Sequence, residues 1–115
     1  MAQLENVVCP TSVTLSLIDG KWKIYILWHL GKNGIMRFSD LRRTLPQISH
    51  KVLTSQLREL AEDKLVHREV IPDIPPKVEY SLTETGKTLV PLLIQMNKWA
   101  RAHKLNLQNA ELHSF

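Results

Sequence analysis

The sequence predicts a mainly α-helical domain that carries one small β-hairpin. Apolar residues recur at helical spacing in most of the chain, and the period changes to two only between residues 65 and 82. The length of 115 residues suits one small domain. A hydrophobic fraction of 43% and a charged fraction of 23% are typical of a globular protein. We therefore treat residues 1–115 as a single domain.

Two helices are expected in the first third of the chain. Pro10 suits the first turn of a helix, where a missing N–H costs nothing, and Gly20 suits its end. The segment 21–30 is apolar on nearly all sides, which predicts a central helix packed on several sides. We expect Gly31 and Gly34 to end this second helix.

A closely spaced pair of helices is expected next. Residues 36–38 are too few for more than a short strand, and Ser39 is expected to cap a helix over residues 40–45. After a three-residue break, Ser49 is expected to cap an amphipathic helix that reaches residue 63. The face of this helix that turns to the core is expected to hold Leu53, Leu57, Leu60 and Lys64.

A hairpin and a last helix complete the chain. Strands are expected over residues 65–71 and 77–82, and apolar and polar side chains alternate in the second of them. The connection, residues 72–76, contains three prolines, which stiffen the hairpin tip. Thr83 is expected to cap the last helix, which we expect to continue past residue 105.

Two helices joined by a three-residue turn and followed by a hairpin form a winged helix-turn-helix. Such a module places its second helix in the DNA major groove and its hairpin beside the flanking backbone. The charge distribution agrees, because residues 21–58 carry eight basic side chains and the single acid Asp40, within a net charge of +4. A local basic field is typical of a surface that binds nucleic acid. Double-stranded DNA is therefore the expected partner.

Several other classes of function are excluded. No apolar run approaches the roughly 20 residues that cross a bilayer, and the N-terminus lacks the pattern of a signal peptide. A single cysteine cannot form a disulfide within the chain, so a cytoplasmic protein is expected. Metal-ligand spacings and phosphate-loop motifs are missing from the sequence. We expect no enzyme activity, no cofactor, no metal and no membrane partner.

The residues expected to contact DNA lie mainly at the start of the second helix of the pair. Polar side chains in its first turns are expected to read bases, and Lys51 can donate to guanine O6 or N7. Ser49 is expected to cap the helix and to donate toward phosphate. Cations elsewhere are expected at phosphates. The full set is Arg42, Arg43, Ser49, His50, Lys51, Thr54, Ser55, Arg58 and Lys77.

Five short segments occur in order along residues 8–103. They are Cys9-Pro10, Gly20-Lys21-Trp22, the run from Arg37 to Arg43, Ile48-Ser49-x-Lys51, and the run from Pro75 to Thr83. Together they resemble the HxlR-type winged-helix transcriptional regulators, relatives of the MarR group. The resemblance implies a bacterial homodimer, held by its first and last helices, on an inverted-repeat operator. It also implies repression or activation of neighbouring genes, often in response to electrophiles, oxidants or aldehydes.

The last helix carries more apolar residues than a domain of this size needs. On a monomer they would form a large exposed apolar patch. We therefore expect a homodimer that forms through the last helix, with a contribution from the first. The expected contacts are Val13, Leu17, Leu89, Leu92, Leu93, Met96, Trp99 and Leu107.

Cys9 allows two interpretations, and the sequence leaves both open. As a small hydrophobe at the start of a helix it would be a buried packing residue. Alternatively, the helix N-terminus lowers the thiol pKa, and the thiolate reacts with an electrophile or oxidant that acts as inducer. In the family that the chain resembles, some members sense through a cysteine at this Cys-Pro position.

A protein–protein interaction module without specific DNA binding is the alternative for the whole chain, because a fold alone does not fix a function. Such a module would favour apolar groups on the outward face of residues 50–58. That face is polar and basic instead, which favours DNA binding.

Overall fold

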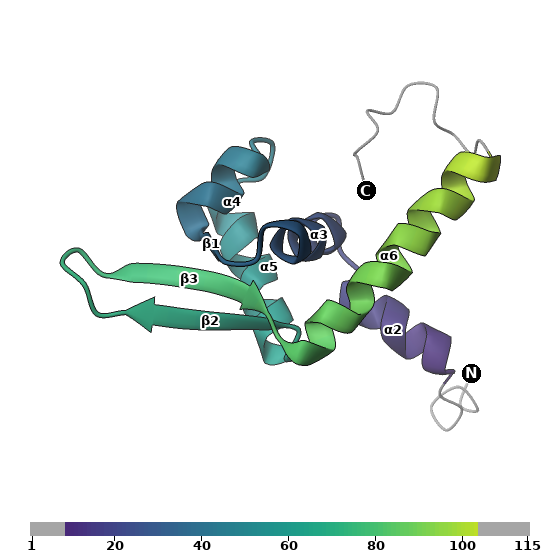
Figure 1. Cartoon of the computed structure of the whole chain (residues 1–115), viewed down its shortest axis with the longest axis horizontal. Coiled ribbons are helices and arrows are strands. Elements are labelled where there is room, and N and C mark those ends of the chain that lie inside the picture. The colour runs from purple at the N-terminus through teal and green to yellow at the C-terminus, as the bar shows by residue number, and fades with distance from the viewer. Residues whose placement is uncertain (1–8, 104–115) are drawn as a thin grey trace.

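The computed structural model describes residues 9–103 and confirms the winged helix-turn-helix fold. Helices α4 and α5 form the helix-turn-helix pair, and strands β2 and β3 form the wing (Figure 1). In chain order the elements are α2 (Pro10–Ile18), α3 (Lys23–Asn33), β1 (Met36–Arg37), α4 (Phe38–Thr44), α5 (His50–Glu62), β2 (Val66–Ile71), β3 (Lys77–Leu82) and α6 (Glu84–His103).

Helix α3 lies in the middle of the molecule and separates two groups of elements. Figure 1 shows α4, α5 and the wing on one side of α3 and the α2 and α6 helices on the other. The fully buried side chains come from both sides and from α3 itself, which agrees with the prediction of a central helix. They include Ile26, Leu27 and Leu30 of α3, Leu53, Leu57 and Leu60 of α5, and Leu93 of α6.

The burial of Leu93 corrects one sequence-based expectation. Its side chain is only 1% exposed and belongs to the core of the single chain. A side chain that its own subunit covers is unavailable to a second subunit, so we leave Leu93 out of the dimer surface. Leu107, and the expected continuation of the last helix past residue 105, lie outside the described residues.

The sheet has three antiparallel strands in the order β1-β3-β2. In the wing, Val66 of β2 lies opposite Leu82 of β3. On the other edge of β3, Met36 of β1 lies opposite Tyr80. The short strand expected at residues 36–38 therefore joins the wing to the start of α4.

Two predicted helix caps are confirmed. The Val52 N–H donates to Ser49 Oγ at 3.1 Å, and the Gly86 N–H donates to Thr83 Oγ1 at 3.0 Å. Thr83 Oγ1 in turn donates to the Lys64 carbonyl oxygen at 2.7 Å. The cap of α6 therefore also fixes that helix to the base of the wing.

The predicted start of α4 is wrong by two residues. We expected Ser39 as the cap, but α4 begins at Phe38 and its N-cap is Arg37. The Arg37 N–H donates to Asp40 Oδ2 at 3.0 Å. The carboxylate of Asp40 therefore supports the helix start from within the first turn, as an acid in that position is expected to do.

Two other helix ends differ from the prediction. Gly31 lies inside α3, which ends at Gly34 with a φ of +81°. A Cβ at Gly31 would lie 2.7 Å from Val90 Cγ2, so glycine permits the close approach of α3 and α6. Lys64 does not extend α5, because the helix ends at Glu62 and Lys64 has a φ of +61°.

Candidate nucleic-acid interface

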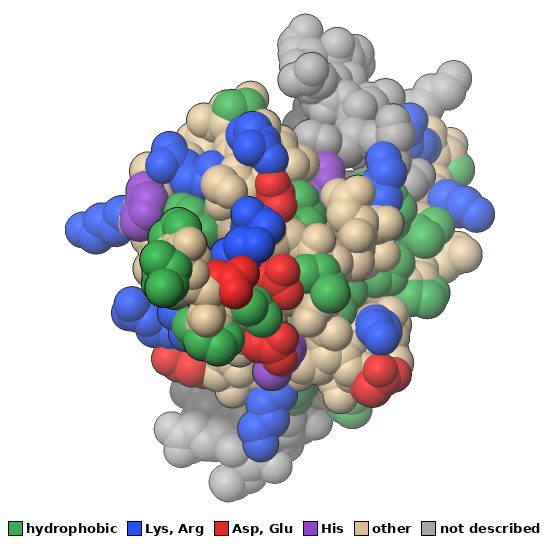
Figure 2. All heavy atoms as spheres, turned by 60° about the vertical axis from the view of Figure 1, so that its left-hand side comes forward, with side chains coloured by type: hydrophobic (Ala, Val, Ile, Leu, Met, Phe, Trp, Pro, Cys, Tyr) green, Lys and Arg blue, Asp and Glu red, His purple; other side chains and the backbone are tan. Residues whose placement is uncertain are grey.

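Charged side chains are mixed on the side of the molecule that carries the wing. Figure 2 brings this side forward and shows Lys and Arg side chains around the face, with a group of Asp and Glu side chains near its centre. The basic field expected from the sequence is therefore interrupted by acids. The contribution of each cation depends on its neighbours.

The outward face of α5 brings five of the predicted DNA-contacting residues together. Side chains that are one turn apart on a helix share one side of it. Those at positions 51, 55 and 58 are exposed to solvent. One shallow surface hollow is lined by His50, Lys51, Thr54, Ser55 and Arg58.

Local contacts define what the start of α5 can offer to a base or a phosphate. The His50 ring packs against the Phe38 ring of α4, with 4.6 Å between the centroids. The Thr54 hydroxyl donates to the His50 carbonyl at 2.8 Å, so Thr54 presents a methyl group and acceptor lone pairs. Ser49 Oγ accepts the cap hydrogen bond and keeps its own proton. Capping and donation to phosphate are therefore compatible.

The predicted phosphate contacts of α4 and the wing differ in their surroundings. Arg43 pairs with Asp40 on the same helix, and Lys77 Nζ lies 3.3 Å from Asp73 Oδ2. Arg42 is exposed and forms no ion pair within residues 9–103. Exposed pairs contribute about 0–1 kcal/mol, so a phosphate can compete for Arg43 and Lys77.

A partly buried ion pair joins α3 to α5, and sequence reasoning missed it. Lys23 is only 4% exposed, and its Nζ lies 2.7 Å from Glu59 Oε1. The Lys23 ammonium lowers the pKa of Glu59 by its hydrogen bond and its charge. Lys23 is therefore unavailable to DNA, although its position in the sequence belongs to the basic block of residues 21–58.

The connection between α2 and α3 rests directly on α5. Gly20 has a φ of +136°, and a Cβ there would lie 2.8 Å from Gln56 Oε1. The positive φ favours glycine at this point, and the short distance shows how closely Gln56 approaches the linker. Gln56 Oε1 is buried and has no hydrogen-bond donor within the described part of the chain. The linker after α2 and the helix that carries most of the predicted DNA-contacting residues are therefore in close contact.

Cys9 is exposed in the single chain and is the N-cap of α2. The backbone N–H of Ser12, followed by that of Thr11, lowers the pKa of the Cys9 thiol below its ordinary value of 9.0. The positive end of a helix favours the thiolate in this way. Within the single chain, Cys9 is therefore not a buried packing residue.

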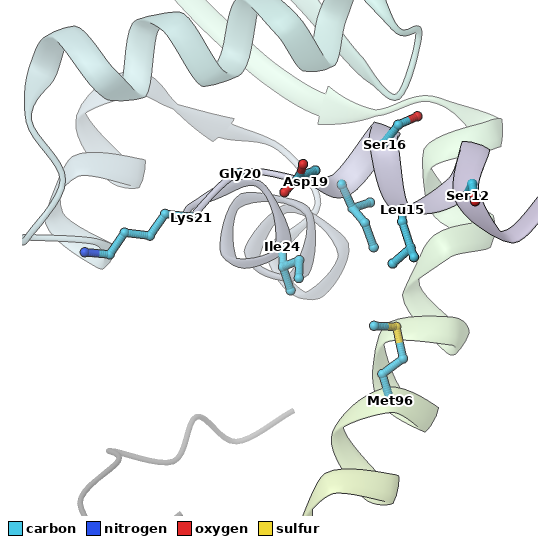
Figure 3. A pocket seen from close by; sticks show the side chains of 9 residues that line it. Ser12, Leu15, Ser16, Asp19, Gly20, Lys21, Ile24 and Met96 are labelled. Atoms are coloured by element: carbon cyan, nitrogen blue, oxygen red, sulfur yellow. The ribbon is translucent and has the colours of Figure 1, made fainter. Parts of the chain in front are cut away.

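Apolar side chains remain exposed on α2 and α6. Trp99 is 57% exposed, and Leu92 and Met96 are about equally exposed at 42% and 41%. On α2, Leu15 is 52% and Val13 is 43% exposed. Figure 3 shows that Leu15 and Met96, which come from different helices, face the same open hollow beside Ile24.

Residues 9–103 contain no helix of the length and apolar character that a bilayer crossing requires. The same residues hold no group of three or more His, Cys, Asp or Glu side chains arranged to bind a metal ion.

A winged helix-turn-helix whose second helix presents polar and basic side chains is the DNA-binding domain of a transcriptional regulator. The chain belongs to the family described as HxlR-like helix-turn-helix, whose model matches residues 17–108. The resemblance inferred from the five sequence segments is therefore confirmed. The known members to which the chain is similar are transcriptional regulators and not enzymes.

Similar proteins include both a curated relative and solved structures. The uncharacterized HTH-type transcriptional regulator YdeP of Bacillus subtilis (strain 168) is 47% identical over 103 residues, which are 90% of this chain and 80% of YdeP. The redox regulator HypR in its reduced form has a TM-score of 0.79 and 47% identity, and covers 86% of this chain and 97% of its own.

Two further structures are of an oxidised and of a diamide-treated protein. The oxidised form of HypR has a TM-score of 0.74 and 50% identity, over 82% of this chain and 96% of that chain. Diamide-treated YodB from B. subtilis has a TM-score of 0.70 and 35% identity, over 84% of this chain and 95% of that chain.

Proposed function

We propose that the protein acts as a homodimer on an inverted-repeat operator, with the α5 helix of each subunit in the major groove. The observation that carries this proposal is the exposed face of α5, where Lys51, Ser55 and Arg58 lie together. The two recognition helices of such a dimer are related by a two-fold axis. We therefore expect half-sites about 34–36 Å apart, one helical turn of DNA.

The proposed dimer forms through α6, with a contribution from α2. The exposed apolar side chains on both helices support this arrangement, because a patch of this kind is rarely left uncovered on a soluble monomer. Leu17 and Leu89 are half-buried at the edges of the same region. The proposed contacts are Val13, Leu17, Leu89, Leu92, Met96 and Trp99, together with Leu107 beyond the described residues.

Two substitutions separate base reading from phosphate contact. Lys51→Ala should cost about 1–3 kcal/mol of binding free energy and relax the preference at one base position, because a side chain that pairs with guanine is lost. Lys77→Ala should weaken binding to every duplex and reduce the salt dependence. The measurement is the Kd of both variants for a panel of operator variants. Equal behaviour of the two variants across the panel would contradict these roles.

The dimer is tested independently by sedimentation. Trp99→Asp places a charge in the exposed apolar patch and should shift the protein from dimer to monomer at micromolar concentration. Arg101→Asp, two residues further along the same helix and therefore on another of its sides, is the matched charge control. A wild-type protein that sediments as a monomer would contradict the proposed dimer. A wild-type protein that prefers no DNA sequence would favour the protein-interaction module instead.

We further propose that Cys9 makes DNA binding responsive to an electrophile or oxidant. Its exposure and its lowered pKa support this role, as does the likeness to the redox regulator HypR. With one cysteine in each chain, the modified form is either an adduct or a crosslink between the two Cys9 thiols of a dimer. The crosslink requires their Cα atoms to lie within about 7 Å.

The test of Cys9 compares the operator affinity of wild type and Cys9→Ser with and without diamide or a quinone. Only the wild-type protein should change its affinity after treatment. If verified modification of Cys9 leaves the wild-type affinity unchanged, the thiol has no role in sensing.

A further inference from the structure

A groove runs between α5 and the wing, beside the surface already described. Its walls include Arg58 and Glu62 of α5, Arg68 of β2 and Tyr80 of β3, and its volume is about 520 Å³. Thr54 and Arg58 line both this groove and the hollow on the outward face of α5. The two depressions therefore adjoin at these residues.

Arg68 of β2 is a charged residue on the face of the wing that otherwise packs against the core. It lies opposite Tyr80, two residues after Val66, which lies opposite Leu82. Side chains alternate along a strand, so Arg68 shares the face of Val66, and Val66 and Tyr80 are only 3% and 8% exposed. Arg68 itself is exposed. The Arg68 guanidinium therefore lies at the solvent-exposed edge of the apolar face of the hairpin. Packing alone does not explain a charged side chain at this position.

The groove offers two guanidinium groups that the rest of the domain does not use. Neither Arg58 nor Arg68 forms an ion pair with any acid in the range 9–103. Guanidinium donors match the oxygens of a phosphate in a planar fork. Glu62 lines the same groove and repels an anion, so a phosphate is expected near Thr54, where the groove joins the α5 surface.

We infer that Arg58 and Arg68 together bind a phosphodiester of the DNA strand that passes between α5 and the wing. This inference rests on the proposed function, because it adds a contact to the same complex. It assigns DNA binding to Arg68, which the sequence did not single out. The arginine in the apolar alternation of β2 is the signal that could have found it.

The test measures how the Kd for DNA depends on salt. The probe is a duplex selected by the wild-type protein from a random-sequence pool. Each phosphate contact contributes about 0.9 to the slope of log K against log salt, so Arg68→Ala should lower the slope of a dimer by about 1.8. The same relation predicts binding that is about 30-fold weaker at 0.15 M salt. The loss should be equal for all base variants of the duplex.

Matched variants separate the phosphate contact from other effects. Arg68→Lys keeps the charge and should retain most of the slope. Lys98→Ala removes an exposed cation from α6, a helix that Figure 1 shows on the other side of α3 from the wing, and should leave the slope unchanged. Circular dichroism and sedimentation of each variant confirm that fold and assembly are intact.

The failures of the two proposals are distinguishable. If the wild-type protein selects no duplex, the proposed function itself fails. If the wild type binds and the folded Arg68→Ala variant keeps its slope, the inference is overturned while the proposed function stands. A change in base preference at one position in Arg68→Ala would also overturn it, because it would show base reading.

Discussion

Replacing Gly86 by alanine should destabilise the protein, although alanine is the better helix former. A Cβ at Gly86 would lie 2.1 Å from the Leu65 carbonyl oxygen and 3.1 Å from its carbonyl carbon. Because ordinary contacts are longer than 3 Å, the start of α6 must retreat from the wing by about 1 Å. That shift lengthens two hydrogen bonds, from the Thr83 N–H to the Leu65 oxygen at 3.1 Å and from Thr83 Oγ1 to the Lys64 oxygen at 2.7 Å.

The expected loss follows from three opposing contributions. Overpacking costs about 1–3 kcal/mol, and weakening the two hydrogen bonds costs about 1 kcal/mol more. The helix preference of alanine over glycine returns about 1 kcal/mol. The net loss is therefore about 2 kcal/mol. An unfolding entropy of about 2.1 cal/mol/K per residue converts this, for 115 residues, to a Tm lower by roughly 8 °C.

Thermal unfolding followed by circular dichroism measures this change, at one fixed protein concentration because a dimer melts in a concentration-dependent way. Thr85→Ala is the matched control, since it changes the neighbouring exposed residue of the same helix turn and should leave the Tm nearly unchanged. A Gly86→Ala variant that melts at or above the wild-type temperature would refute the argument from close approach.

Three further predictions rest on individual contacts. Gly31→Ala should lower the Tm because its Cβ would lie 2.7 Å from Val90 Cγ2. Adding Val90→Ala should recover part of the lost stability. If the stability changes of the two substitutions simply add in the double variant, the contact is contradicted. Alkylation of Cys9 by iodoacetamide should show a pH midpoint below 9.0, and a midpoint at or above it would contradict the effect of the helix start. Lys23 lowers the pKa of Glu59, so urea unfolding should show Glu59→Gln to be less stable than wild type above pH 4.5. The difference in unfolding free energy should shrink as the pH falls through the lowered pKa. A difference that persists at pH 2 would exclude this cause.

Features that depend on a few neighbouring residues could be predicted from the sequence. Ser49 and Thr83 are caps because a hydroxyl oxygen lies within reach of an N–H three residues later. The second strand of the wing follows from alternation in residues 77–82, and α5 follows from its regular apolar face. These local signals also predict which face of α5 is polar and exposed, without any knowledge of tertiary contacts.

Features that depend on contacts between distant segments could not be predicted. In the sequence, Lys23 cannot be distinguished from a surface cation, because its partner Glu59 lies 36 residues later and reaches it only in the folded chain. Gly31 resembles a helix end because the sequence does not show that Val90 requires its missing side chain. Leu93 was assigned to a dimer surface because an apolar helix face does not reveal which of its residues the same chain covers.

The position of β3 between β1 and β2 determines how the protein can examine a duplex. Arg37 of β1 lies opposite Glu79, only two residues from the start of β3, so pairing holds the wing close to its tip as well as at its base. A hairpin anchored in this way cannot swing independently of α4 and α5. The distance between the wing and the recognition helix is then fixed, so the DNA must deform in order to contact both. We therefore expect sequences whose grooves adopt the required width at low energetic cost to be preferred, even at base pairs that no side chain touches.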